Sequence, residues 1–402
     1  MTSIPPFDVA LEQAEGRTLV AEVGQPVAAP RIAALDGLRG LAIFLVLSWH
    51  YFHVDAVVVH GSPLGYLNSL TRLAWSGVDL FFVLSGFLIG GILLDARDSP
   101  GYFPAFYARR AYRILPLYGV VVALYLATSP VLPRQPTEPP LYVLATITQN
   151  IWVALGGTLY SAWLRVTWSL GVEEQFYLLA PIIFRKLKTS RLAVLIAAIV
   201  CATPLLRAAL WWAGERGWMA SYMLTPARAD ALSLGVAAAM LVRTPVGRRW
   251  LLERRVWLYG LLVALAGVYL IFTRMDWSIE SFQMSLIGYT CIALLYTILL
   301  LLVVSHSDGL LARFFRFRPL VSLGTIAYAL YLFHEPVKYI LHLAYLGRPP
   351  RVVTLRDAGV QLLALLISIA LARLSWAYFE RPLINRGHRW SYWPATSTAS
   401  AE

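Results

Sequence analysis

Long apolar runs alternate with short polar and basic segments along most of the chain. A helix that crosses a bilayer needs about 20 predominantly apolar residues, because each residue adds about 1.5 Å of length. The pattern therefore predicts an all-α polytopic membrane protein with about ten transmembrane helices. We place these spans at 40–58, 75–94, 114–132, 168–184, 192–212, 229–243, 256–273, 284–304, 320–342 and 358–379.

The stretch 141–156 is also apolar, and we interpret it as an interfacial or re-entrant segment and not as a span. With that assignment and a cytoplasmic N-terminus, 22 of the 34 Lys and Arg residues lie on the cytoplasmic side. This excess predicts that both termini are cytoplasmic. The loop with Arg348, Arg351 and Arg356 is the exception, because this topology places it outside.

The composition agrees with a protein of the cell membrane. Of the 402 residues, 58% are hydrophobic and 14% are charged, against about 25% charged in a typical soluble domain. The net charge is +12, but the basic residues lie between apolar runs, so we expect no nucleic-acid partner. Cys201 and Cys291 have no neighbours at metal-ligand spacing, so we predict no metal site.

Residues 1–30 are polar and contain several prolines, and they lack the basic segment and apolar core of a cleavable signal. We therefore expect a flexible cytoplasmic lead at 1–30, one membrane domain at 31–385 and a short cytoplasmic tail at 386–402. No internal repeat of the kind found in many transporters is visible.

An ionisable residue inside an apolar span is costly and usually marks a site. His50 lies about ten residues into the first span, roughly 15 Å along the helix. Arg39 precedes it by eleven residues, which brings both side chains to one helix face. We expect one elongated ligand to contact both, with an anionic head at Arg39 and a reactive centre at His50. The alternative for His50 is a structural hydrogen bond to a neighbouring helix.

A basic cluster in "FYARRAYRILPLY" precedes the third span. Arg109 or Arg110 can share a helix face with Arg113, and two guanidinium groups on one face can clamp a phosphate. The alternative is an ordinary positive flank, which is common at the cytoplasmic end of a span.

Two carboxylates, Glu173 and Glu174, lie just inside the fourth span. Because adjacent residues on a helix point about 100° apart, only one of them is expected to face a given interior site. The other would cap a helix, pair with an arginine or line an outer vestibule.

The ninth span, in "IAYALYLFHEPVKYI", places several polar residues on one helix face. A polar stripe of this kind indicates a functional lining when it occurs in a membrane. The residues are Tyr328, Tyr331, His334, Glu335 and Lys338.

Two further acidic residues are candidates for lining the site: Asp36, in the motif around Arg39, and Asp79, in the second span. Arg228 and Asp230 begin the sixth span, where we expect them to pair with each other. The small residues of "SGFLIGG" in the second span are expected to pack closely against another helix.

Five motifs occur in an order that resembles the acyltransferase-3 family of bacterial integral-membrane acyltransferases, over about residues 31–385. The first, "LDGLRGLAIFLVLSWH", is similar to the family's motif of an arginine and a histidine separated by ten residues. The others are "GVDLFFVLSGFLI", "RRAYRILP", "WSLGVEEQFY" and "YALYLFHEP".

The resemblance implies ten spanning helices and transfer of an acyl group, with acetyl expected, from acyl-coenzyme A to a hydroxylated acceptor. The acceptor would be a sugar, a polysaccharide or a natural product such as a macrolide. It also implies that His50 is catalytic, that the arginines hold coenzyme A and that no cofactor is permanently bound. We expect the stand-alone type, without the hydrolase-like domain that some members carry after the last helix.

These implications and the residue placements together suggest a mechanism. His50 would accept the proton of the acceptor hydroxyl, and Glu173 or Glu174 would orient its ring. Tyr331 or His334 would donate to the oxyanion. An acyl-histidine intermediate is the alternative to direct transfer. Two other classes use the same residues differently: a transporter or proton-coupled permease, and a polysaccharide-binding scaffold without chemistry.

Overall fold

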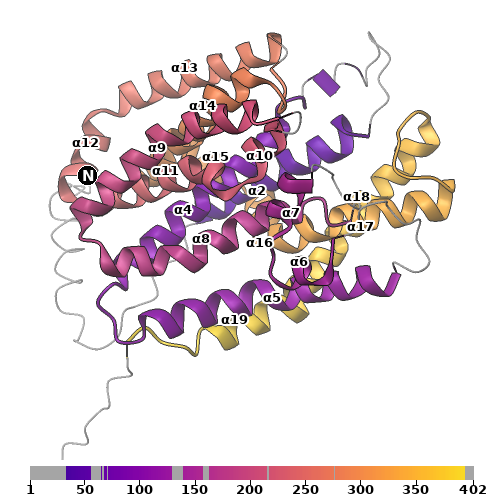
Figure 1. The fold of residues 1–402 in the computed structure, drawn as a ribbon, viewed down its shortest axis with the longest axis horizontal. Helices are drawn as coiled ribbons and strands as arrows, with labels where there is room; N and C mark the ends of the chain where they lie inside the picture. The colour runs from indigo at the N-terminus through magenta and orange to yellow at the C-terminus, as the bar shows by residue number, and fades with distance from the viewer. Residues whose placement is uncertain are drawn as a thin grey trace, which may run out of the picture.

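The computed structural model describes residues 33–55, 65, 68–69, 71–128, 139–156, 163–214, 217–275 and 277–393. These residues form a bundle of helices, and no β-strand occurs among them (Figure 1). The predicted lead at 1–30 lies outside the described residues. The all-α prediction is confirmed.

Each of the ten predicted spans contains one long helix, and several also include a shorter helical segment. These helices are α2 (Ala33–Ser48), α4 (Gly77–Asp95), α5 (Tyr102–Thr128), α8 (Thr167–Lys186), α9 (Thr189–Trp212), α11 (Thr225–Arg243), α13 (Arg255–Arg274), α14 (Tyr289–Ser305), α17 (Ala327–Leu346) and α18 (Leu355–Ser375).

Shorter helical segments connect or extend them. They are η1 (Trp49–His53), η2 (Ala74–Ser76), α6 (Leu141–Ala145), α7 (Gln149–Gly156), α10 (Gly217–Met223), α12 (Pro245–Glu253), η3 (Met284–Gly288), α15 (Leu310–Phe315), α16 (Arg318–Thr325), η4 (Trp376–Glu380) and α19 (Arg381–Gly387).

Seven helices within the described residues are long and apolar enough to cross a membrane. Two bent pairs raise the number to nine: α10 and α11 with α12, at 98°, and α16 with α17, at 73°. The fourth predicted span, α8, has 20 residues, but it contains two glutamates and a basic last turn, and it is not among these nine. The segment 141–156 is no span, because it breaks into α6 and α7 around Ile147, whose φ is 53°.

The predicted start of the third span was wrong by twelve residues. Helix α5 begins at Tyr102, so the cluster of Arg109, Arg110 and Arg113 lies within the helix and not before it. Hydropathy detects the apolar part of a helix, whereas the helix itself continues through residues such as Ala, Arg and Tyr that favour or tolerate it.

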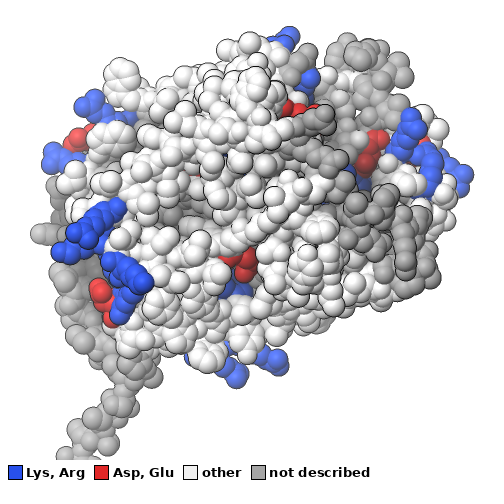
Figure 2. Space-filling view, in the orientation of Figure 1, with Lys and Arg blue, Asp and Glu red and all other residues white. Residues whose placement is uncertain are grey.

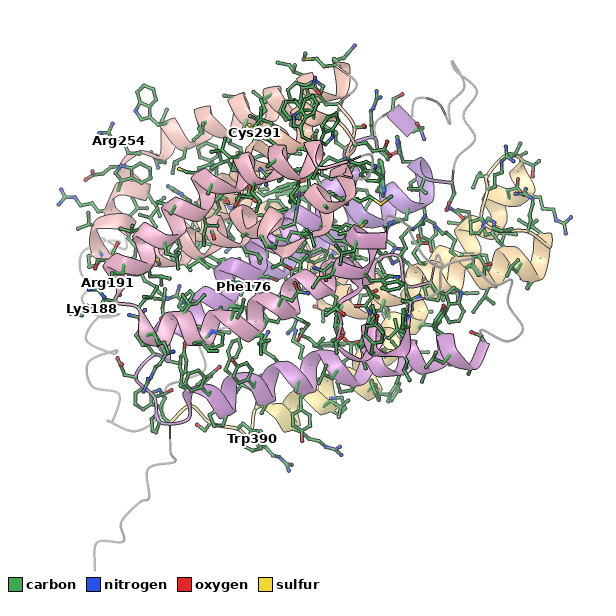
Figure 3. All side chains as sticks on the ribbon, in the orientation of Figure 1. Phe176, Lys188, Arg191, Arg254, Cys291 and Trp390 are labelled. Atoms are coloured by element: carbon green, nitrogen blue, oxygen red, sulfur yellow. The ribbon has the colours of Figure 1, made fainter. Side chains whose placement is uncertain are left out.

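On the face shown in Figure 2, basic side chains lie mostly toward the two ends of the bundle, and the surface between them is largely uncharged. Lys188, Arg191 and Arg254 share one end (Figure 3). The turn between α17 and α18 lies at the opposite end (Figure 1). The predicted topology requires both placements.

Helices α2, α4 and α14 form the centre of the bundle, while α13 and α18 lie at its periphery: 72% of the apolar window of α4 is buried, against 11% for α13. The glycines of "LDGLRG" explain how α2 enters this centre. A Cβ at Gly37 would lie 1.8 Å from the carbonyl oxygen of Phe315, and one at Gly40 would lie 2.0 Å from that of Leu320. Only glycine allows this approach of α2 to α15 and α16, which positions Arg39.

The predicted small-residue face of α4 packs as expected, against α11. A Cβ at Gly86 would lie 2.0 Å from the carbonyl oxygen of Leu232, and one at Gly235 would lie 2.1 Å from that of Val83. Backbone contact of this kind is how helices associate tightly in membranes.

Candidate active site

His50 lies on a turn of π-helix, η1, that continues α2 after Ser48. The Nδ1 atom of its imidazole is 3.0 Å from the carbonyl oxygen of Val46 and 3.2 Å from Nε2 of His334. Single π-helical turns within α-helices occur often at functional sites, because the extra residue reorients the side chains around it. Here that turn brings the first predicted site residue beside the polar stripe of α17.

The stripe on α17 forms a buried ion network next to this imidazole pair. The Glu335 carboxylate accepts hydrogen bonds from Arg165 at 2.8 Å and from Lys338 at 2.8 Å. The Lys338 ammonium also donates to the carbonyl oxygen of His50 at 3.0 Å and lies 2.6 Å from a carboxylate oxygen of Asp55. Each buried charge in this network therefore faces an opposite charge.

We call the first of two large cavities the histidine cavity. It encloses about 820 Å³ of space, open solvent included, and aromatic rings form much of its wall. Its charged lining residues are Arg165 and Glu280. Its other lining residues include Trp49, His50, Trp75, Val78, Trp168, Trp218, Tyr222 and Tyr331.

The second, the arginine cavity, encloses about 1050 Å³, open solvent included. The structure brings Arg39 of α2 together here with Arg110 and Arg113 of α5. In Figure 2, acidic and basic atoms are visible together between α8 and α5, which are helices that line this cavity. Further lining residues are Val78, Ser85, Glu173, Tyr177, Tyr328, Tyr331 and Glu380.

The two cavities meet at Val78 and Tyr331, which line both of them. The Tyr331 hydroxyl donates to the carbonyl oxygen of Val166 at 2.9 Å and lies 2.5 Å from the Ser169 hydroxyl. This fixes the ring at the boundary. The Tyr331 hydroxyl therefore already donates its proton to a backbone carbonyl, whereas the sequence analysis expected it to donate to an oxyanion.

Glu173 lines the arginine cavity, and the adjacent Glu174 lines neither cavity, which differs from their predicted pairing with His50. Glu173 accepts hydrogen bonds from Ser85 at 2.6 Å and from Tyr177 at 3.2 Å. Within the described residues, the carboxylate beside the two imidazoles is that of Glu335, with an oxygen 3.9 Å from Nε2 of His334.

Arg109 does not join the arginine cavity. Its Nε atom donates to the carbonyl oxygen of Trp390 at 2.9 Å, and its guanidinium carbon lies 4.6 Å from the centre of the Tyr392 ring. Trp390 lies beside α5 and α19 (Figure 3). Arg109 thus binds the segment after α19, and of the two predicted arginine pairs the structure supports Arg110 with Arg113.

The pKa of His388 is affected by the positive potential around these arginines. Partial burial lowers the pKa of its imidazole, and the charges of Arg109, Arg110 and Arg113 lower it further. A site with this potential favours an anionic group.

The acidic candidates Asp36 and Asp79 line neither cavity. Asp36 accepts a hydrogen bond from Arg39 at 3.0 Å and so restrains that guanidinium. Asp79 forms a buried ion pair with Arg228. Asp230 pairs with Arg207 at 2.8 Å, so the predicted pairing of Arg228 with Asp230 was wrong.

His50, His334 and Glu335 could together ligate a metal ion, since one ligand atom from each lies within 4.8 Å of the others. However, both Glu335 oxygens already accept hydrogen bonds from cations, and His50 Nδ1 lies beside a carbonyl oxygen. We therefore interpret the three as acid–base groups.

Sequence analysis placed His334, Glu335 and Lys338 on one face but missed their partners. Arg165 and Asp55 come from connecting segments, where no helical periodicity singles out a residue. The one sequence feature that pointed to Glu335 as the carboxylate near the imidazoles is that it directly follows His334.

The chain is similar to known acyltransferases. A family model described as an acyltransferase domain matches residues 32–378, which include all the cavity arginines and both imidazoles. The chain is also similar to curated O-acetyltransferases. No solved structure matches it.

Three of these relatives come from different organisms. The O-acetyltransferase OatA of Staphylococcus aureus is 24% identical over 371 residues, which cover 88% of this chain and 58% of the relative. The putative peptidoglycan O-acetyltransferase YrhL of Bacillus subtilis is 27% identical over 409 residues, covering 92% and 59%. The peptidoglycan O-acetyltransferase OatA of Listeria monocytogenes is 27% identical over 378 residues, covering 89% and 56%.

This chain thus spans less than two thirds of the length of those relatives. The family match, by contrast, covers most of the chain, and the matched helices include several of membrane-spanning length. This multi-pass membrane protein belongs to the acyltransferase-3 family.

Proposed function

We propose that this protein transfers an acetyl or similar acyl group from acyl-coenzyme A to a hydroxyl of a carbohydrate acceptor, with His50 as the general base. The observation that carries the proposal is that the arginine cavity and the histidine cavity meet at Val78 and Tyr331. An anionic donor held in one cavity can therefore present its acyl end to the base in the other.

The arginine cavity suits the phosphates of coenzyme A. Arg39, Arg110 and Arg113 offer planar groups of N–H donors that match phosphate oxygens. The phosphates are too strongly hydrated to enter hydrocarbon. They would remain at the arginines while the pantetheine arm extends past Tyr331 toward His50.

The histidine cavity suits the acceptor. An alcohol is a weak nucleophile near neutral pH, so a neutral imidazole that accepts its proton is needed. The acceptor oxygen would form a bond to the thioester carbon as His50 takes the proton. The C–S bond then breaks, and the leaving thiolate recovers that proton from His50, so that no proton is gained or lost.

Arg165 is the best-placed donor for the oxyanion of this step. It lines the histidine cavity, and among the described residues its Nε atom has no hydrogen-bond partner. The predicted donors Tyr331 and His334 have their polar atoms engaged with protein groups. A preorganised cationic donor near the developing charge lowers the barrier.

The aromatic wall of the histidine cavity, with Trp49, Trp75, Trp168 and Trp218, supports an acceptor with a ring that can pack against flat side chains. Two relatives are named for peptidoglycan, which supports a glycan over a macrolide.

The test is acyl transfer by the purified protein in nanodiscs, with radiolabelled acetyl-coenzyme A and either a peptidoglycan glycan fragment or a macrolide. We expect label on the glycan and a fall of about 10²- to 10⁴-fold in His50→Ala. His306→Ala, at the end of α14, is the matched control and should transfer normally.

A wild-type rate of acyl transfer by His50→Ala would refute the role of His50 as the general base. Labelled macrolide without labelled glycan would change the acceptor class. Absence of transfer, combined with substrate flux across vesicles, would indicate a transporter. Label retained on the protein without acceptor would favour an acyl-histidine intermediate.

A further inference from the structure

We infer that His334 is a positioning residue that holds His50 in the tautomer with the proton on Nδ1 and the lone pair on Nε2. The inference deepens the proposed function, because it names the group that takes the place of the carboxylate expected from the sequence. It rests on the heavy-atom geometry of two imidazoles and two carbonyl groups.

The protonation of His334 follows from its first contact. Its Nδ1 atom lies 3.1 Å from the carbonyl oxygen of Leu330, one helical turn earlier. A carbonyl oxygen can only accept, so Nδ1 must carry the hydrogen. In a neutral imidazole the other nitrogen, Nε2, then carries a lone pair and acts as an acceptor.

That acceptor faces His50. Nε2 of His334 lies 3.2 Å from Nδ1 of His50, and the same Nδ1 lies 3.0 Å from the carbonyl oxygen of Val46. Two acceptors thus converge on one nitrogen, which must therefore be the protonated one. The lone pair of neutral His50 is left on Nε2, the nitrogen that remains for the histidine cavity.

His334 cannot easily turn away from this role. Its side chain is fully buried, its ring lies 5.9 Å from that of Tyr331 and 5.0 Å from that of His50, and its backbone carbonyl accepts from the Tyr51 hydroxyl at 3.3 Å. The contacts come from α17 and from η1. The orientation of the base is thus set by the packing of these two segments.

Glu335 lies near the same nitrogen of His334 that faces His50. Its carboxylate oxygen lies 3.9 Å from Nε2 of His334 and is held by Lys338. When His50 takes up a proton, its positive charge appears in a buried setting, where an opposite charge is worth more than in water. The carboxylate of a hydrolase triad likewise stabilises the charged imidazole; here the carboxylate lies near the junction of two imidazoles.

The kinetic test compares His334→Leu with His334→Gln. Leucine removes one of the two acceptors and leaves the Val46 carbonyl as the other. We expect kcat for acetyl transfer to fall by about 10²-fold, the lower end of the range found when a catalytic histidine loses its orienting partner or its base function. The side-chain oxygen of glutamine can accept from His50 Nδ1, so His334→Gln should recover at least about tenfold of that loss. The KM for acetyl-coenzyme A should change little in both variants.

His342→Leu is the matched control. His342 is another fully buried histidine of α17, and its Nε2 atom contacts the Gln361 side chain at 2.8 Å. It lines neither cavity, so His342→Leu should keep the wild-type kcat. An equal loss in His334→Leu, His334→Gln and His342→Leu would show that buried histidines of α17 act only through folding, and would overturn the inference.

A second measurement needs no variant of His334. The chain has seven histidines, so ¹⁵N-histidine labelling gives few ring signals, and the signal lost in His50→Ala assigns His50. We expect the spectrum of a neutral ring protonated at Nδ1. A ring protonated at Nε2 would overturn the inference even if acyl transfer is confirmed. The expected tautomer in a protein that transfers no acyl group would leave the inference intact and refute the proposed function instead.

Discussion

The Lys338 ammonium donates a hydrogen bond to the backbone carbonyl oxygen of His50, 3.0 Å away, and so joins α17 to the π-helical turn that presents the imidazole. The same ammonium bonds Glu335 and lies beside Asp55. Because Lys338 is fully buried, its charge is balanced by these carboxylates and not by water. The position of His50 therefore depends on an ion network that reaches beyond its own helix.

Replacing this lysine tests that dependence. Lys338→Met leaves two carboxylates without their shared cation, and breaking a buried pair in this way costs about 3–5 kcal/mol. We expect a lower unfolding temperature in detergent, together with loss of acyl transfer. Arg249→Met, which removes an exposed pair with Glu253, is the control and should unfold like the wild type. A Lys338→Met protein with wild-type unfolding and transfer would contradict this role.

The arginines of α5 offer a comparison within a single helix. Arg110→Ala and Arg113→Ala should each raise the KM for acetyl-coenzyme A by about 10- to 100-fold, the worth of a hydrogen bond to a charged group. Arg109→Ala should change the KM little, because that guanidinium binds Trp390 and Tyr392. Steady-state kinetics over a range of donor concentrations give these values. Three equal effects would mean that the helix acts as an undifferentiated positive flank.

The carboxylates on the two sides of the boundary should affect different constants. Glu335→Gln removes the negative charge beside the imidazole pair, so kcat should fall by about 10²-fold. Glu173→Gln removes a negative charge from the wall of the arginine cavity, so phosphates should bind better and the KM for the donor should fall while kcat is retained. If Glu173→Gln instead abolishes kcat, Glu173 is the partner of His50, as the sequence first indicated.

The helical architecture was largely predictable, because a membrane span must be apolar over a fixed length and each predicted span contains one long helix. The boundaries were not. The start of α5 lies in a run with Arg109, Arg110 and Arg113 that hydropathy excludes from a span, although its residues are good helix formers. Bends such as that between α16 and α17 arise from packing that no local pattern encodes.

For the site, the sequence identified His50, Arg39, Arg110 and Arg113, because charge inside an apolar run is conspicuous. It could not choose among carboxylates, because spacing along one helix fixes a face but not the neighbour which that face meets. Glu173 and Glu335 are both acidic residues inside predicted apolar spans, so the sequence alone does not distinguish them. Only the packing of α8 and α17 places one beside the arginines of the arginine cavity and the other beside the imidazoles.

Donor binding should be linked to proton uptake at His388. Burial and the three nearby arginines lower the pKa of this imidazole below its usual value of 6.5. Bound phosphates would favour the charged form, so the pKa should rise on binding, and protons should be taken up near pH 6 but not at pH 8. Calorimetry of coenzyme A binding in buffers of different ionisation enthalpy measures this uptake. The uptake should disappear in His388→Gln, and its persistence there would assign it to another group.

Val78 offers a way to separate donor binding from transfer, because it lines both cavities at their junction. Val78→Trp adds a large ring where the pantetheine arm would pass Tyr331, so we expect acetyl transfer to fall by about 10²-fold or more, the effect expected when reacting groups are kept apart. Coenzyme A should still bind, because the arginines are unchanged. Val263→Trp on α13, where the valine is 70% exposed, is the matched control and should leave both properties unchanged. Transfer by Val78→Trp at the wild-type rate would show that the acyl group reaches His50 by another route.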